Sequence, residues 1–161
     1  MIDHKNCYRK IGKSIVLKDY FENQNLSFQK YYGFDVSFVP LEIILAEPVL
    51  KEINDRYEIS TGGIIRLDSN RCYKWHSDSN RGVSINLLLN PEIESLVLFG
   101  NSVFDSDDQY EILKFEYEKD TFYLFNTQMM HTVINFDLPR YLFTVEFKQD
   151  KSVLTFNNLL S

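Results

Sequence analysis

The second half of the chain consists of short apolar segments separated by turn residues, and this pattern limits the folds that the chain can adopt. The segments end at Asp68-Ser69-Asn70, at Asn90-Pro91 and at Gly100-Asn101. Short β-prone segments about 8–12 residues apart are typical of a β-sandwich or barrel. Aromatic residues, which favour strands over helices, make up 15% of the chain. We therefore expect a mainly β protein, with strands at 64–67, 73–76, 83–89, 95–99, 110–117, 121–125 and 141–147.

The first half of the chain has a more varied pattern. Residues 7–17 alternate loosely and residues 31–39 are rich in aromatic side chains, so both predict strands, with a hairpin or loop between them. Residues 41–47 and 48–56 predict two short helices. Proline is tolerated in the first turn of a helix, so we expect Pro48 to begin the second helix rather than interrupt a longer one.

The length of 161 residues predicts a single domain, 1–161. We expect its core at about 60–148, preceded by N-terminal strands and helices in 1–59. The tail, 150–161, is expected to add a last strand or to pack on the outside, and the acidic residues at 105–108 predict a solvated loop. Hydrophobic residues make up 44% of the chain, which is enough for a packed core.

Charge and cysteine content exclude several classes of protein. A formal net charge of -6 argues against the basic face that nucleic-acid binding needs. Cys7 and Cys72 are the only cysteines, too few for a disulfide framework, and they predict free thiols in a reducing compartment. The sequence begins without a signal-peptide pattern, and no apolar stretch approaches the roughly 20 residues that cross a bilayer. We expect a cytoplasmic protein without a membrane segment.

Three residues form a candidate metal site. His76 and Asp78 lie two apart in a predicted strand, where alternation places both side chains on one face. With His131 they would supply two imidazoles and one carboxylate, a set that suits Fe(II) and leaves positions open for a co-substrate and oxygen. A closed four-ligand zinc site would not leave that room. Taken singly, each has an ordinary alternative: a chance pair, or a core histidine at a strand end.

Arg140 opens a strand of β-branched and aromatic residues, where a buried, unpaired guanidinium would cost several kcal/mol. Either the side chain points to solvent after the turn at Pro139, or it has an anionic partner. A guanidinium suits a carboxylate bound through two hydrogen bonds. Thr144 shares the strand face of Arg140 and would add a hydroxyl to the same carboxylate.

Taken together, these residues resemble the Fe(II)/2-oxoglutarate-dependent oxygenase superfamily. The pattern consists of His76-x-Asp78, then His131, which is 55 positions after His76, and then Arg140, which is nine positions after His131. Tyr73, three residues before His76, is similar to the approach to the first ligands in prolyl-hydroxylase-like members. The closing segment from His131 to Thr144 is also similar. Residues 63–90 resemble aspartyl/asparaginyl hydroxylases, in which an arginine-led strand follows the first ligands.

The resemblance, over roughly residues 60–148, implies a double-stranded β-helix, a cupin-like jelly roll with one or two short helices in its N-terminal half. It implies Fe(II) held by His76, Asp78 and His131, with 2-oxoglutarate held by Arg140 and Thr144. The expected enzyme is a dioxygenase that uses O2 to hydroxylate a C–H bond of a small molecule or peptide, including an amino-acid side chain, and releases succinate and CO2.

Two departures from relatives narrow the chemistry. Nucleic-acid demethylases of the superfamily carry asparagine and arginine where this chain has Leu142 and Glu146, which argues against base repair. Halogenating members replace the ligand carboxylate, and Asp78 is present here, so hydroxylation is expected.

Five further residues are candidates for the site. Asn86 is polar within an apolar strand and is expected to bind the co-substrate or a ligand, or else a neighbouring backbone group. Tyr73 is expected to face the co-substrate pocket. Trp75, Arg81 and Arg66 are candidate substrate contacts, with core or surface positions as their ordinary alternatives.

Two other functions stay open. A cupin-like β-barrel that binds a metal or small ligand without oxygenase activity would also gather histidines and a carboxylate, but it has no need of Arg140 as a carboxylate clamp. A structural jelly roll would keep the three candidate ligands apart. The primary substrate and the oligomeric state cannot be read from the sequence.

Overall fold

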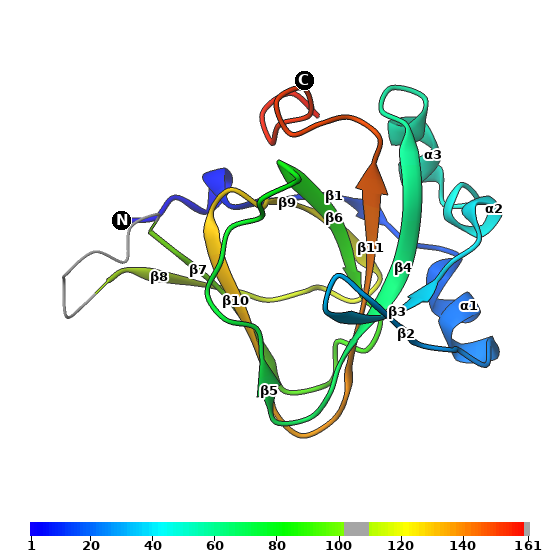
Figure 1. The fold of residues 1–161 in the computed structure, drawn as a ribbon, viewed down its shortest axis with the longest axis horizontal. Helices are drawn as coiled ribbons and strands as arrows, with labels where there is room; N and C mark the ends of the chain where they lie inside the picture. The colour runs from blue at the N-terminus through cyan, green and yellow to red at the C-terminus, as the bar shows by residue number, and fades with distance from the viewer. Residues whose placement is uncertain (102–109, 160–161) are drawn as a thin grey trace.

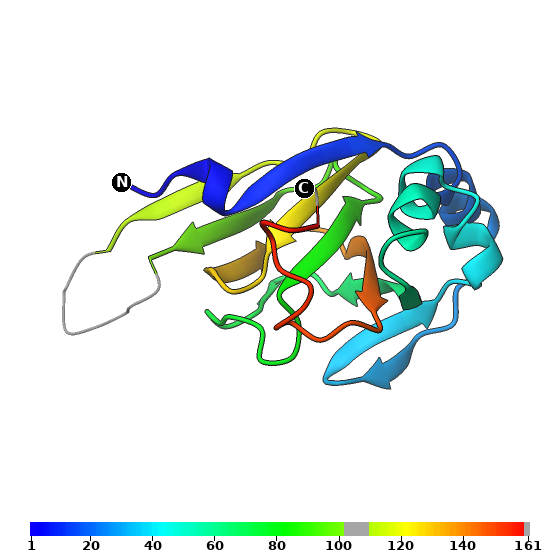
Figure 2. The ribbon, with the colours of Figure 1, turned by 90° about the horizontal axis from the view of Figure 1, so that it is seen from above.

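The computed structural model describes residues 1–101 and 110–159, so the acidic segment 105–108 lies outside the described residues. Two antiparallel sheets face each other (Figures 1 and 2), one of seven strands in the order β1-β9-β6-β11-β4-β3-β2 and one of four in the order β5-β10-β7-β8. The strands are β1 (Tyr8–Lys13), β2 (Gln29–Tyr31), β3 (Phe34–Phe38), β4 (Ile59–Leu67), β5 (Arg71–Cys72), β6 (Val83–Leu88), β7 (Ser95–Gly100), β8 (Ile112–Phe115), β9 (Thr121–Asn126), β10 (Met130–Asn135) and β11 (Arg140–Phe147).

Strand alternation divides the interior into two layers. On β11, Phe143 and Val145 point into the larger hydrophobic core, which lies between the seven-stranded sheet and the helices. Figure 1 shows three helices on that outer side of the sheet, next to β4: α1 (Leu17–Asn23), α2 (Leu41–Ile44) and α3 (Pro48–Asn54). The intervening residues of β11 have the opposite direction and face the second sheet. A smaller core of mostly aromatic side chains, including Phe99 and Phe125, fills part of the space between the two sheets.

Most of the predicted elements are present. The two expected helices are α2 (Leu41–Ile44) and α3 (Pro48–Asn54), and Pro48 stands in the first turn of α3. None of the helices in the described part of the chain is long and apolar enough to cross a membrane.

Two local predictions were wrong. The strand expected to reach residue 17 ends at Lys13, and the expected hairpin or loop begins with a helix, α1 (Leu17–Asn23). Residues 73–76 are not a regular strand, since β5 ends at Cys72 and His76 makes only an isolated bridge. Of the two alternatives for the tail, a last strand and outside packing, the strand is not formed: residues 151–159 form turns, and three of their side chains pack into the larger core: Leu154, Phe156 and Leu159.

The tail also packs closely against the segment that precedes β6. A Cβ atom on Gly82 would lie 2.6 Å from the backbone oxygen of Leu154, so a larger residue would displace one of the two segments.

The start of α1 depends on a buried carboxylate from the other end of the helical layer. Glu47 is fully buried just before α3. It accepts hydrogen bonds from the Ser14 hydroxyl at 2.6 Å and from the backbone N–H groups of Ile15 at 2.9 Å, Val16 at 2.8 Å and Leu17 at 2.9 Å. These N–H groups have no partner within the helix, so Glu47 supplies the missing cap.

We expect Glu47→Ala to lower the free energy of unfolding by about 3–5 kcal/mol, because several buried donors lose their acceptor at ~1–3 kcal/mol each. Urea denaturation measures this loss. Glu52→Ala, at an exposed position of α3, is the matched control. Equal stability of the two variants would show that the cap is dispensable.

Candidate metal centre

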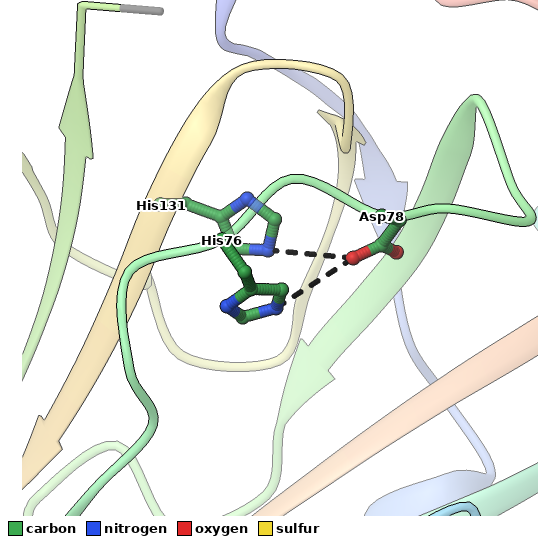
Figure 3. A group of neighbouring side chains, drawn as sticks. All are labelled: His76, Asp78 and His131. Atoms are coloured by element: carbon green, nitrogen blue, oxygen red, sulfur yellow. Dashed lines mark ion pairs between the residues drawn. The ribbon is translucent and has the colours of Figure 1, made fainter. Parts of the chain in front are cut away.

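His76, Asp78 and His131 converge on one point (Figure 3). One ligand atom from each lies within 4.8 Å of the others. Nε2 of His76 is 3.6 Å and Nε2 of His131 is 3.8 Å from the same oxygen, Oδ1 of Asp78. The two imidazole rings are tilted, with 4.3 Å between their centroids. The arrangement is therefore three donor atoms around a space the size of a single ion.

Backbone hydrogen bonds join the two remote segments that carry these side chains. The N–H of His76 donates to the carbonyl of His131 at 3.1 Å, and the N–H of His131 donates back at 2.9 Å. Residues that exchange both bonds in an antiparallel bridge project their side chains to the same face. The N–H of Asp78 donates to Thr127 at 2.8 Å, which holds the third residue beside β10. This bridge, rather than a strand through 73–76, brings the side chains together.

Contacts of one kind, between Nδ1 and a nearby backbone carbonyl, set the tautomer of each histidine. Nδ1 of His76 lies 2.7 Å from the carbonyl of Lys74, and Nδ1 of His131 lies 2.8 Å from that of Met129. A carbonyl can only accept, so Nδ1 carries the proton and the lone pair of Nε2 faces Asp78. Burial lowers the pKa of His131, so its imidazole is neutral, the form that binds metals.

The second oxygen of Asp78 is also engaged. Arg81 Nε donates to Oδ2 of Asp78, which leaves Oδ1 for the shared space. Thr127 and Gln128 hold this loop by donating to the carbonyl of Arg81 at 2.7 and 2.8 Å, and Gln128 also donates to that of Asp78 at 3.0 Å. Sequence analysis missed Thr127 and Gln128, whose contacts depend on the packing of two remote segments.

Arg140 lies at the start of β11 on the inner face, and its side chain is buried, with 2% of the residue exposed. Among the described residues no carboxylate forms an ion pair with it, and its Nε has no hydrogen-bond partner. The guanidinium carbon is 5.6 Å from the centre of the Tyr117 ring. Burial lowers the pKa of Arg140 from its ordinary value, as expected for a cation removed from water.

A second polar group of the inner face is also without a partner: Thr144 Oγ1 is buried and makes no hydrogen bond to a described residue. The buried Tyr117 hydroxyl lies beside Arg140 and Asn86. Burial raises the pKa of Tyr117 to about 12, against the opposite effect of the charge on Arg140. Asn86 lies opposite Thr144 in the sheet and donates to Ser84 Oγ at 2.9 Å, so its amide has a neighbouring partner. Arg140, Thr144 and Asn86 are therefore buried polar side chains in an otherwise apolar interior.

Tyr117 was missing from the sequence-based candidates, although a signal for it existed. It follows Leu113 and Phe115 at intervals of two, and all three pack in the smaller core. Tyr117 lies two residues past the end of β8, and extending the alternation of that strand places its side chain on the inner face.

The remaining candidates occupy different places. Tyr73 is half-buried, its ring is 5.1 Å from that of Phe34, and burial raises its pKa to about 12 against the charge of Arg140. Trp75 is half-buried and packs edge-on against Tyr110 at 6.0 Å. Arg66 lies over the Phe28 ring on the outer face of β4 and pairs with acidic residues, with Nε 3.2 Å from Asp68.

A cavity of about 290 Å³ opens beside the metal-ligand cluster. Its wall includes His76, Asp78 and Arg81 on one side, and Thr144 and Glu146 of β11 on the other. The β2–β3 hairpin closes a third side with aromatic rings. Of the three residues predicted to contact substrate, Arg81 lines this cavity. Trp75 and Arg66 are not among the described residues that line it, so their positions give that prediction no support.

Comparison of the chain with protein-family models and with curated proteins found no match.

Solved structures do match. A prolyl hydroxylase from Trichoplax adhaerens, in complex with a hypoxia inducible factor peptide fragment, is similar with a TM-score of 0.62 at 14% identity, over 93% of this chain and 86% of that one. A Pseudomonas putida prolyl-4-hydroxylase gives 0.60 at 15%, over 89% and 93%. A 2OG-Fe(II) oxygenase family oxidoreductase from Burkholderia pseudomallei gives 0.59 at 14%, over 82% and 76%. These likenesses confirm, at the level of fold, the resemblance predicted from the sequence: the chain has the mainly β jelly-roll fold of prolyl hydroxylases and other 2OG-Fe(II) oxygenases.

Proposed function

We propose that this protein is an Fe(II)- and 2-oxoglutarate-dependent dioxygenase that hydroxylates a C–H bond and releases succinate and CO2. The observation that carries the proposal is the combination of two features on the inner face. One is an open cluster of two imidazoles and a carboxylate, His76, Asp78 and His131. The other is a buried guanidinium, Arg140, that has no carboxylate partner among the described residues.

The donor set fits ferrous iron. The Nε2 atoms of both histidines carry lone pairs. Arg81 engages Oδ2 of Asp78, so Oδ1 is free to bind the metal, and three ligand atoms are presented from one side. Two neutral imidazoles and one carboxylate compensate part of the charge of a divalent ion, and half of an octahedron stays open. The carbonyl contacts at Nδ1 fix the direction of both imidazoles before the metal arrives.

The unpartnered atoms of the inner face fit a dicarboxylate. The distal carboxylate of 2-oxoglutarate needs cationic and hydroxyl donors, and Arg140 and Thr144 offer them from one face of β11. The Tyr117 hydroxyl is a further donor beside Arg140. We therefore assign Arg140, Thr144 and Tyr117 to the co-substrate, with Tyr73 and Asn86 bordering the same space.

When bound, iron would supply the activation of O2, the oxidant, with 2-oxoglutarate as the co-substrate that is oxidised to succinate and CO2. The chain supplies orientation and the exclusion of water. Arg140 and Thr144 orient the co-substrate, while Arg81 holds the carboxylate of Asp78 in one direction. The aromatic side chains of the smaller core, among them Phe99 and Phe125, exclude water from one side of the site.

A cupin-like barrel that binds metal without oxygenase activity is the second candidate function. The histidine–aspartate cluster alone fits both functions. Arg140 favours the oxygenase, because a buried cation without a carboxylate partner is costly unless an anion binds beside it. The substrate is proposed to be a small molecule or a peptide, and the Trichoplax adhaerens relative was solved with a peptide.

Anaerobic titration with Fe(II) and 2-oxoglutarate tests the proposal. We expect a weak visible charge-transfer band only when both are present, and loss of the band in His131→Ala, because the metal loses one of three ligands. His4 is exposed and is the only histidine outside the cluster, so the control variant His4→Ala should keep the band. A wild-type protein without the band would favour the cupin-like function.

Arg140→Met should raise the concentration of 2-oxoglutarate needed for the half-maximal band by about 10–100-fold, because charged hydrogen bonds contribute ~1.5–3 kcal/mol. The same titration of Arg66→Met is the control, since Arg66 lies on the outer face of β4. If Arg140→Met needs the same concentration of 2-oxoglutarate as the wild type, the guanidinium does not bind the co-substrate.

Arg140→Met should be at least as stable as the wild type when no ligand is bound. Replacing a buried charge by an apolar side chain of similar size is neutral or stabilising, so we expect the free energy of unfolding to rise by about 1 kcal/mol in urea denaturation. Marked destabilisation would instead mean that the charge of Arg140 is already satisfied by the protein.

A further inference from the structure

The cavity wall opposite the metal-ligand cluster combines aromatic rings with a carboxylate. Tyr31, Tyr32 and Phe38 come from the β2–β3 hairpin, and Glu146 comes from β11. The Tyr31 ring packs edge-on against Tyr32 at 4.6 Å and against Phe38 at 5.2 Å. The three rings therefore form one continuous aromatic surface at the entrance to the cavity.

Two of these rings are exposed to solvent. Tyr32 is 80% exposed and Phe38 is 38% exposed. Tyr32 has a φ of 48° because it and Gly33, with a φ of 85°, form the two-residue turn between β2 and β3, and such hairpin turns have positive φ at both positions. The turn presents the Tyr32 ring to solvent beside the cavity, where it is available to a ligand.

Glu146 provides the second element. Its carboxylate accepts a hydrogen bond from the Tyr31 hydroxyl at 3.2 Å, and no described cation lies within ion-pair distance of it. Arg81, the guanidinium on the metal-ligand side of the cavity, is already paired with Asp78. The opposite wall therefore has a carboxylate and electron-rich ring faces, and no described cation is paired with that carboxylate.

We propose that this wall binds a cationic group of the substrate, an ammonium or guanidinium such as that of a lysine or arginine side chain. Ring faces and a carboxylate attract such a group together, whereas an anionic substrate group would be repelled. The net charge of -6 adds a general attraction for cations. The inference rests on the proposed function and names the substrate class of the same site.

The position of Glu146 also limits where the reaction would occur on that substrate. Thr144 and Glu146 both line the cavity and lie two residues apart on one face of β11, so about 7 Å separates them along the strand. Thr144 borders the proposed co-substrate space. A substrate cation held at Glu146 would therefore lie apart from the co-substrate, and the reaction would occur on another part of the substrate than the charged nitrogen.

A pair of matched probes tests the proposal. Nα-acetyl-lysine methylamide and Nα-acetyl-norleucine methylamide have similar side chains, but only the lysine side chain carries an ammonium group. We expect calorimetric titration of the anaerobic protein with Fe(II) and 2-oxoglutarate to show about tenfold tighter binding of the lysine probe. Glu146→Gln, which keeps an acceptor for Tyr31, should remove most of this preference, and Tyr32→Leu, at an exposed ring, should reduce it.

Glu58→Gln is the control, because Glu58 is an exposed carboxylate paired with Lys148 and outside the cavity wall. Equal binding of the two probes, no binding of the lysine probe, or a preference that survives in Glu146→Gln would overturn the inference. The charge-transfer band of the wild-type protein is read separately. If the band appears but the two probes bind equally, the cation site is wrong and the oxygenase proposal stands. If the lysine probe is preferred but no band appears, the cation site stands and the oxygenase proposal is wrong.

Discussion

The two backbone hydrogen bonds between His76 and His131 are the interaction on which the candidate site depends. They join an irregular segment after β5 to the edge of β10, and they place two imidazoles on the same side of the four-stranded sheet. Each imidazole then uses a carbonyl two residues earlier to direct its Nε2 inward. The geometry of the cluster is thus determined by main-chain contacts, which the chain forms whether or not an ion is bound.

Buried polar atoms distinguish the inner face of the seven-stranded sheet from its outer face. The outer face carries Phe143 and Val145 into a core shared with the helices, and it gains stability from that burial. The inner face carries Arg140 and Thr144, and the Nε of Arg140 and the Oγ1 of Thr144 are buried without a hydrogen-bond partner among the described residues. Such groups weaken the folded state unless a ligand satisfies them. The same strand therefore stabilises the fold with one side and offers a binding site with the other.

Sequence patterns predicted those parts of the fold that depend on local periodicity. Alternation placed Arg140 and Thr144 on one face of a strand, and Pro48 marked the start of a helix, as the structure has them. Helix α1 was missed because its cap, Glu47, is 30 residues from the Leu17 N–H that it accepts. Such a contact leaves no signal within the segment itself.

For the candidate site, the spacing of His76 and Asp78 was informative, although its explanation through a regular strand was wrong. The loop contacts of Gln128 depend on tertiary packing and could not be predicted. The outward direction of Arg66 was within reach of strand alternation on β4, and Tyr117 was within reach of it on β8. Their assignment to the site required knowing which face of each strand is the inner one.

The close contact of Gly82 with Leu154 has a consequence for the loop that carries Asp78. Leu154 is 76 positions later in the chain than Asp78, yet its carbonyl lies against the backbone that leads directly out of that loop. Leu154, Phe156 and Leu159 hold the tail in place through the larger core. The C-terminal segment therefore supports the loop of a candidate metal ligand through Gly82, and substitutions in that segment can shift the candidate metal centre from a distance.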